Sequence, residues 1–299
     1  MDFCQIVPLS YLEPLKNKLN RNNVHLLLAH LVESSDKYNE FYKKLKFDRS
    51  EHPSGSNTPA KTFIMDNAGF EMYRQGLPFF PAEKLIDLGR KVYADYIVLP
   101  DYPGRHFTKT IEAAIEYAPK FREAGIKTFF APQSEAGKIE DYIASFAWAA
   151  SSPLIDYIGL SILAIPIAYG VDTPGNIQVF GSRLSMVEEL YNRTLISLAK
   201  ANGKKIHFLG MTDGPKEIVN AARYTGFHID SWDSSAAVWA GIQDVPFDNS
   251  PTGLINGKIH KHVDFDIEFD EGKLPLIHKN IEAIQKYTSM YNHIHIPTA

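Results

Sequence analysis

Short apolar runs alternate with longer amphipathic stretches along most of this chain. Most of the short runs are continuously apolar, as strands buried on both faces should be, and there are seven of them: HLLLAHL (25–31), TFIMD (62–66), DYIVLPD (95–101), TFFAPQ (128–133), YIGLSI (157–162), KIHFLGM (205–211) and FHIDSWD (227–233). Residues 106–125, 135–152 and 182–200 place apolar side chains at helical spacing. The expected buried stripes are Phe107, Ile111, Ile115 and Ala118, then Ile139, Ile143, Phe146 and Ala150, then Val187, Tyr191, Leu195 and Leu198. Gly125 and Gly203 stand where helices should end.

Strand and helix alternating about seven times predict an α/β fold with a parallel sheet. A closed (β/α)8 TIM-like barrel and an open doubly wound sheet both fit. We favour the barrel, because the repeat count is high and no glycine-rich dinucleotide loop is present. The eighth strand comes either from the N-terminus or from 258–269.

We expect a single domain over 1–299, because one α/β barrel fills about 250 residues. Its core should cover about 24–240, and 241–299 should form a hairpin around 258–269 and a last amphipathic helix at about 275–291.

Composition narrows the function classes. Cys4 is the single cysteine, which excludes a disulfide within the chain and a structural zinc site of several thiolates. The apolar runs fall short of the roughly 20 residues that span a bilayer, and the N-terminus does not resemble a secretory signal. We therefore expect a cytoplasmic protein without membrane contact. The net charge of −4 gives no basic footprint for nucleic acid, so any such function must be argued from the site.

Polar residues follow most of the apolar runs. They are Asp66, Asp101, Gln133, Ser161 and Asp233. In a (β/α)8 barrel the carboxyl ends of the strands form one rim, where active sites lie. A single aspartate at such a position is more often a helix cap, but several at one rim are less easily explained in that way.

This set of side chains suits a purine of the guanine type. Asp101 could accept from its adjacent N–H and amino groups, a Gln133 amide could satisfy its carbonyl, and Gly159 would let the backbone approach closely. Aromatic residues close to these positions could stack on an extruded base, namely Phe70, Tyr73 and Tyr102. The spacings HKH (260–262) and HIH (293–295) could bind metal, but both lie outside the barrel pattern, and we predict no metal site.

The same positions resemble the tRNA-guanine transglycosylase superfamily. FIMDNAGF (63–70) is similar to a strand-end motif of aspartate, serine, two glycines and phenylalanine, with Asn67 and Ala68 replacing the serine and the first glycine. LPDYPG (99–104) resembles the segment that carries the base-reading aspartate, here Asp101.

The resemblance continues in the same order along the chain. APQSE (131–135) matches a valine-glutamine-glycine-glycine segment at Gln133 but lacks both glycines. YIGLSI (157–162) resembles the glycine-rich strand that touches the base, through Gly159, and HFLGM (207–211) resembles a leucine-glycine strand. HIDSWDSS (228–235) is similar to the stretch that holds the nucleophile, which aligns with Asp233. Together the segments cover about 60–240.

The departures point to one branch of the family. SSAAVWAG (234–241) replaces the residues that grip tRNA, and the cysteine-rich zinc site is missing. The chain therefore resembles the compact paralogues of phages and bacterial genomic islands, which insert 7-deazaguanine bases into DNA. The resemblance implies exchange of guanine in DNA for 7-cyano-7-deazaguanine or a relative, with no cofactor.

By this analogy Asp233 is the nucleophile and Asp66 the acid and base. Asp101, Gln133, Gly159, Phe70, Tyr102, Ser161 and Asp230 would bind the substrate. Asp230 is the rival nucleophile, although strand alternation puts it on the opposite side from Ser231. Three alternatives remain open: the same exchange on tRNA, a non-catalytic subunit that binds nucleic acid or a partner, and an unrelated barrel hydrolase acting on a small molecule.

Overall fold

The computed structural model describes residues 1–48, 61–69, 72, 76, 78–171, 176–211, 217, 220, 229–247 and 265–292. Its strands are β1 (Asp2–Gln5), β2 (Val24–Leu28), β3 (Thr62–Asp66), β4 (Tyr96–Val98), β5 (Lys127–Phe130), β6 (Tyr157–Ser161), β7 (Lys205–Leu209) and β8 (Ser231–Ser234). Its α-helices are α1 (Lys16–Asn20), α2 (Ala29–Ser34), α3 (Asp36–Phe47), α5 (Ala82–Lys91), α6 (Phe107–Glu123), α7 (Ile139–Ser151), α8 (Ala164–Ala168), α9 (Asn176–Asn192), α10 (Leu195–Ala201), α12 (Ala236–Ile242) and α13 (Leu274–Asn292). Two 3₁₀ turns are η1 (Leu9–Tyr11) and η3 (Glu271–Lys273).

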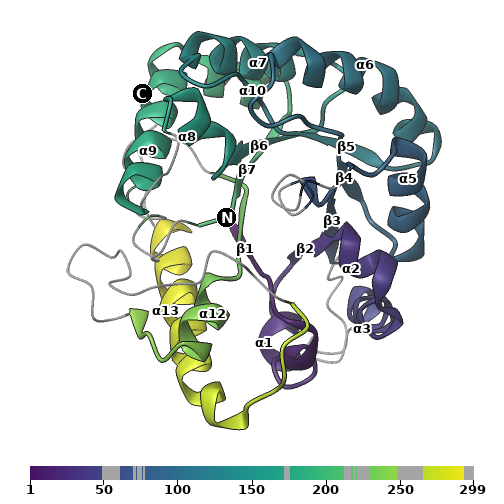
Figure 1. The fold of residues 1–299 in the computed structure, drawn as a ribbon, viewed down its shortest axis with the longest axis vertical. Coiled ribbons are helices and arrows are strands. Elements are labelled where there is room, and N and C mark those ends of the chain that lie inside the picture. Colours follow the sequence, from purple (N-terminus) through teal and green to yellow (C-terminus); the bar gives the residue numbers. More distant parts are fainter. Residues whose placement is uncertain are drawn as a thin grey trace.

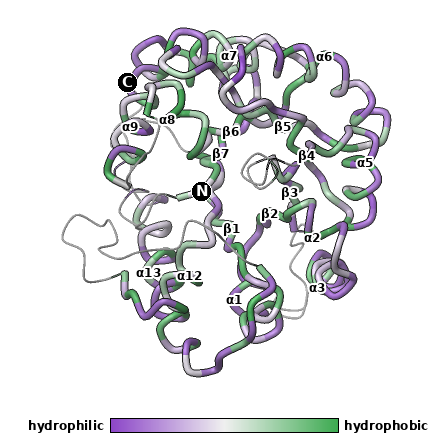
Figure 2. The backbone as a smooth tube through the Cα atoms, viewed as in Figure 1, coloured by the Kyte–Doolittle hydropathy of each residue, from purple (hydrophilic) through white to green (hydrophobic). Residues whose placement is uncertain are grey.

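All eight strands form one parallel sheet in the order β1-β8-β7-β6-β5-β4-β3-β2. Its two end strands, β1 and β2, lie against each other, so the sheet curls into a ring with the helices outside it (Figure 1). The predicted (β/α)8 TIM-like barrel is therefore confirmed. In Figure 2 the outer helices carry polar and hydrophobic segments in alternation, as amphipathic helices do when one face packs on the sheet.

The N-terminus supplies the eighth strand. β1 pairs with β8 in register, with Asp2 opposite Ser231 and Cys4 opposite Asp233. The barrel thus begins at Asp2 rather than near residue 24. Most of the alternative segment, 258–269, and with it the expected hairpin, lies outside the described residues.

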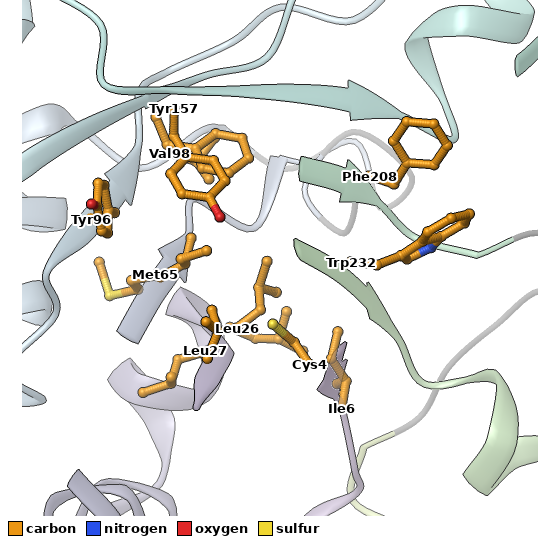
Figure 3. Close-up of a cluster of buried hydrophobic side chains, with 14 of the residues drawn as sticks. Cys4, Ile6, Leu26, Leu27, Met65, Tyr96, Val98, Tyr157, Phe208 and Trp232 are labelled. Carbon is orange, nitrogen blue, oxygen red and sulfur yellow. The ribbon is translucent and has the colours of Figure 1, made fainter. Parts of the chain in front are cut away.

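The barrel interior is filled by side chains from alternate strand positions. Figure 3 shows Cys4, Leu26 and Tyr157 within the ring of strands, whereas Phe208 and Trp232 lie on its outer side. Residues paired in a parallel sheet point to the same side, so Asp233 faces inward with Cys4. By the same alternation Asp66, two residues beyond the Ile64 partner of Leu26, also faces inward.

The helices deviate from the expected pattern in three places. The apolar run 25–31 leaves the strand at Leu28 and continues as α2, because a short apolar run is compatible with either structure. The segment 182–200 is two helices, interrupted at Thr194, which has a φ of 59°. Within the stripes, Ile115, Tyr191 and Leu198 are exposed, so those three positions were wrong. Gly125 and Gly203 do end helices, with φ of 77° and 70°.

Within the described part of the chain, no helix has the length and apolar character needed to cross a membrane.

Candidate active site at the carboxyl end of the barrel

Asp101 lies at the centre of a buried polar cluster just beyond β4. Its Oδ1 accepts a hydrogen bond from Asn67 Nδ2 at 2.7 Å, and its Oδ2 accepts one from Gln133 Nε2. The three residues come from the loops that follow β3, β4 and β5, and each is at most 8% exposed. Asn67 Nδ2 also donates to the Leu99 carbonyl at 2.9 Å, which fixes its orientation. The structure thus brings Asp101 and Gln133 together as predicted.

Burial raises the pKa of Asp101 to about 6, although the hydrogen bonds from Asn67 and Gln133 act in the opposite direction. The carboxyl group therefore changes charge close to neutral pH. Next to it, Gln133 Oε1 is buried and has no hydrogen-bond partner among the residues that the structure describes. Gln133 Nε2 uses one of its two hydrogens on Asp101, so the amide offers an acceptor at Oε1 as well as the donor that the sequence suggested for a base carbonyl.

Asp66 ends β3 and shapes the loop that carries Asn67. Its Oδ2 accepts from the Ala68 N–H at 3.1 Å, and Asn67 Oδ1 accepts from the Gly69 N–H at 2.6 Å. Ala68 has a φ of 59°, a conformation that favours glycine. A Cβ on Gly69 would stand 2.9 Å from Asp101 Oδ1, so this loop passes close to the buried carboxylate.

Asp233 lies on β8 and is held from two directions. Its Oδ1 is 2.8 Å from His207 Nε2 and accepts from the Gly210 N–H at 2.9 Å. Oδ2 accepts no hydrogen bond from the residues that the structure describes. The Asp233 side chain is 7% exposed, whereas that of His207 is completely buried. Oδ1 is thus fixed by two donors, whereas the described residues leave Oδ2 without a donor.

A line of hydrogen bonds continues inward from His207. Its Nδ1 lies 2.5 Å from Ser231 Oγ, and Ser231 Oγ lies 2.6 Å from the Tyr157 hydroxyl. Ser231 is completely buried. Asp233 is the outermost member of this line, because it stands two residues nearer than Ser231 to the carboxyl end of β8.

The Gly210 backbone is itself anchored behind Asp233. Gly210 has a φ of 72°, and its carbonyl accepts from Arg183 Nη1 at 2.6 Å and from Trp232 Nε1 at 3.0 Å. The buried Arg183 guanidinium lies 4.7 Å from the Phe208 ring centroid. The N–H that binds Asp233 is therefore presented by a constrained turn.

Two other predicted residues, Gly159 and Ser161, have structural roles. A Cβ on Gly159 would stand 2.4 Å from Phe129 Cε1 and 2.6 Å from Leu209 Cδ1, so side chains fill the space that was expected for a base. Ser161 Oγ accepts from the N–H groups of Leu163 and Ala164, which makes it the local cap of the turn into α8.

Asp230 does not join the site. It precedes β8, at the amino end of the barrel, where it forms an ion pair with Lys200 and accepts from the Ile206 N–H at 2.7 Å. The expectation that Asp230 contacts substrate or competes as nucleophile is therefore wrong, because it lies at the opposite end of β8 from the rim.

The aromatic residues are only partly placed. Tyr102 follows Asp101, with the Phe79 ring 5.8 Å away and Lys109 Nζ 4.3 Å above its own ring centroid. This half-buried ring could contribute to stacking at the rim. Phe70 and Tyr73 lie outside the described residues.

Sequence reasoning missed His207 and Asn67. A histidine within an apolar strand resembles a core residue, and Asn67 was noted only as a replacement for serine. The signal for His207 was the alternation of β7, which puts it on the inward side with Leu209, next to the inward Ser231 and Asp233 of β8.

Three side chains near the rim could hold a divalent cation. The ligand atoms of His106, Glu135 and Asp141 lie within 4.8 Å of one another. His106 and Glu135 are exposed, and exposed groups of this kind often gather without an ion. We assign this cluster no chemistry. The histidine spacings at 260–262 and 293–295, for which no metal site was predicted, lie outside the described residues.

Neither a family model nor a curated protein matches this chain. The site itself therefore bears on the chemistry: the buried Asp101 cluster and the doubly held Asp233 both lie at the carboxyl end of the barrel.

Proposed function

We propose that this protein is a guanine transglycosylase, which exchanges a guanine in DNA for a 7-deazaguanine base such as 7-cyano-7-deazaguanine. The observation that carries the proposal is Asp233, a buried carboxylate with one oxygen held by two neighbours, while its other oxygen accepts no hydrogen bond from the described residues. A carboxylate nucleophile needs this arrangement, because it must be ionised, oriented and accessible at one atom.

Asp101 and Gln133 support the choice of a guanine-like base. Both Asp101 oxygens and the open Gln133 Oε1 are acceptors, and they suit the adjacent N–H and amino donors of a guanine edge.

The loop at Asp66 supports the family resemblance. Ala68 stands where the motif of the transglycosylases has its first glycine, and its φ of 59° is a glycine-like conformation. The backbone therefore has a conformation that a glycine adopts readily, although the residue here is alanine.

In the first half-reaction Asp233 Oδ2 attacks C1′ of the target nucleotide. The bond from C1′ to N9 breaks, and its electron pair leaves with the guanine, which takes a proton from Asp66. The product is a sugar ester of Asp233, and the phosphodiester strand stays intact. Retaining glycosidases use a carboxylate nucleophile and a second carboxyl group in the same way.

In the second half-reaction Asp66, now ionised, takes the N9 proton of the incoming 7-deazaguanine. N9 attacks C1′, the ester bond breaks, and its electron pair returns to Asp233. Asp101 and Gln133 hold both bases in turn, so the two half-reactions use a single base site.

Base exchange can be tested by incubating the protein with labelled guanine and, in parallel, single-stranded DNA, duplex DNA and tRNA, followed by nucleoside analysis. We expect label in DNA. Label in tRNA alone would transfer the activity to that substrate, and no label in any of the three would refute the proposal.

The nucleophile is tested with Asp233→Asn, which keeps the shape of the side chain. We expect incorporation to fall by at least about 1,000-fold, on the scale of other nucleophile deletions. Asp230→Asn is the matched control, because it changes a carboxylate of the same segment at the other end of the barrel. Undiminished exchange by Asp233→Asn would disprove the assignment.

A further inference from the structure

We propose that His207 is a positioning residue, which holds Asp233 through its neutral Nε2–H tautomer, and that Ser231 and Tyr157 select that tautomer. The kinetic part of this inference rests on the proposed base exchange, whereas the tautomer does not. The line from Tyr157 to Asp233 is outside the base-binding cluster around Asp101.

The donors in this line can be assigned from its acceptor end. An ionised Asp233 has only acceptors, so His207 Nε2 must donate to its Oδ1 across 2.8 Å. In a neutral ring Nδ1 is then an acceptor, which is satisfied by the Ser231 hydroxyl at 2.5 Å.

The Tyr157 hydroxyl completes the assignment. Ser231 Oγ donates to His207 and can accept from Tyr157 across 2.6 Å. Each group then donates once towards Asp233, and hydrogen bonds in a chain of this direction polarise one another. A doubly protonated His207 would donate from Nδ1 to Ser231 Oγ, and either the Ser231 or the Tyr157 hydroxyl hydrogen would then have no acceptor within this line.

The depth of the line separates this arrangement from a serine hydrolase. Ser231, His207 and Asp233 are the residue types of a catalytic triad. However, Ser231 and His207 are completely buried, and Asp233 is the outermost member, with 7% of its side chain exposed. A substrate at the rim therefore meets the carboxylate and not the hydroxyl.

The consequence for Asp233 is that its two oxygens become different. His207 and Gly210 both donate to Oδ1, which prevents the carboxylate from rotating and leaves Oδ2 as the attacking atom. Holding the reacting atom in place lowers the barrier of the chemical step more than it improves binding. Loss of His207 should therefore lower kcat and leave the KM for the base almost unchanged.

The tautomer can be read without any substrate. We would label the histidine rings with ¹⁵N, record long-range ¹H–¹⁵N spectra of the full chain, and assign His207 by the signal that is lost in His207→Gln. The expected spectrum has a protonated Nε2 and an unprotonated Nδ1. Ser231→Ala and Tyr157→Phe should move the Nδ1 resonance. Ser234→Ala is the matched control and should not move it, because the Ser234 hydroxyl accepts from the Ala236 N–H and lies outside this line. A protonated Nδ1, or no response to Ser231→Ala, would overturn the inference.

The kinetic arm compares two substitutions at position 207. Gln can still donate to Asp233 from its amide, so His207→Gln should retain exchange within about 10-fold, while His207→Leu should lose roughly 100-fold in kcat, on the scale of other orienting partners. If His207→Leu does not fold, Ser231→Ala takes its place, with a smaller loss in kcat.

The two arms also separate the two proposals. If the wild type exchanges bases and His207→Leu has the same kcat, the positioning role alone is refuted. If His207→Leu does not fold, an unaltered kcat in Ser231→Ala has the same meaning. The expected tautomer without exchange on any nucleic acid would refute the proposed function alone.

Discussion

Nε2 of His207 lies 2.8 Å from Oδ1 of Asp233, although 26 positions separate the two residues in the chain. The contact follows from the sheet, because His207 pairs in register with Ser231 on the neighbouring strand and Asp233 is the next inward residue. The candidate nucleophile is thus supported by two adjacent strands of the same barrel.

The first prediction concerns the stability of the protein as a function of pH. Burial raises the pKa of Asp101 from 3.8 to about 6, so the folded protein binds this proton more tightly than the unfolded chain. The resulting stability is fully present below about pH 4 and is lost as the pH rises through 6.

Asp101→Asn removes this dependence. Between pH 4 and 7 the free energy of unfolding of the wild type should fall relative to that of Asp101→Asn by up to about 3 kcal/mol. Urea unfolding at several pH values measures the difference between the two proteins. A difference that does not change with pH would contradict the raised pKa.

The second prediction concerns binding of the base. If Asp101 accepts from two donors of guanine, it must be ionised, so the affinity of the wild type for guanine should weaken roughly 10-fold for each pH unit below about 6. Isothermal calorimetry between pH 5 and 8 checks this. In Asp101→Asn the affinity should be lower and independent of pH, and an unchanged profile would remove Asp101 from the base site.

The third prediction concerns Gly159 as a packing residue. A Cβ at this position would stand 2.4 Å from the Phe129 ring, so Gly159→Ala should lower the free energy of unfolding by about 1–3 kcal/mol. Gly181→Ala is the matched control, because Gly181 lies in α9 and a Cβ there meets nothing within 4 Å. That change should stabilise by about 0.5–1 kcal/mol. Equal effects in urea unfolding would show that Gly159 is not tightly packed.

The fourth prediction separates the two aspartates near β8. Asp230→Asn loses the ion pair with Lys200 and weakens the acceptor for the Ile206 N–H, so the free energy of unfolding should fall by about 1–2 kcal/mol. Base exchange per folded molecule should stay at the wild-type rate. Thermal unfolding together with the exchange assay tests both statements, and a large loss of exchange in the folded variant would restore Asp230 as a candidate for the site.

Much of the barrel could be predicted because buried parallel strands are continuously apolar. TFIMD (62–66) coincides with β3 and YIGLSI (157–162) contains β6. β1 is only four residues long and reads DFCQ, which is too short to show a pattern. Its identity depends on pairing with β8, a contact that local sequence does not encode.

The site was predictable where a polar residue directly follows an apolar run. Asp101 and Gln133 do meet, since neighbouring strands of a parallel sheet end at the same rim. Asp230 was placed wrongly because the run 227–233 was read as one strand, whereas β8 begins at Ser231. His207 could not be recognised from β7 alone, because its role comes from the register between β7 and β8.

β1 lies between β8 and β2, so the first strand of the chain cannot complete its pairing until the last strand, β8, has been made. Cys4 reaches its place beside Asp233 only after more than 220 further residues have been synthesised. Contacts of such long sequence separation form slowly, so ring closure should be a late event in folding. The Asp233 centre would then be assembled at the seam of the ring, and a nascent chain that has not yet produced β8 would lack this centre.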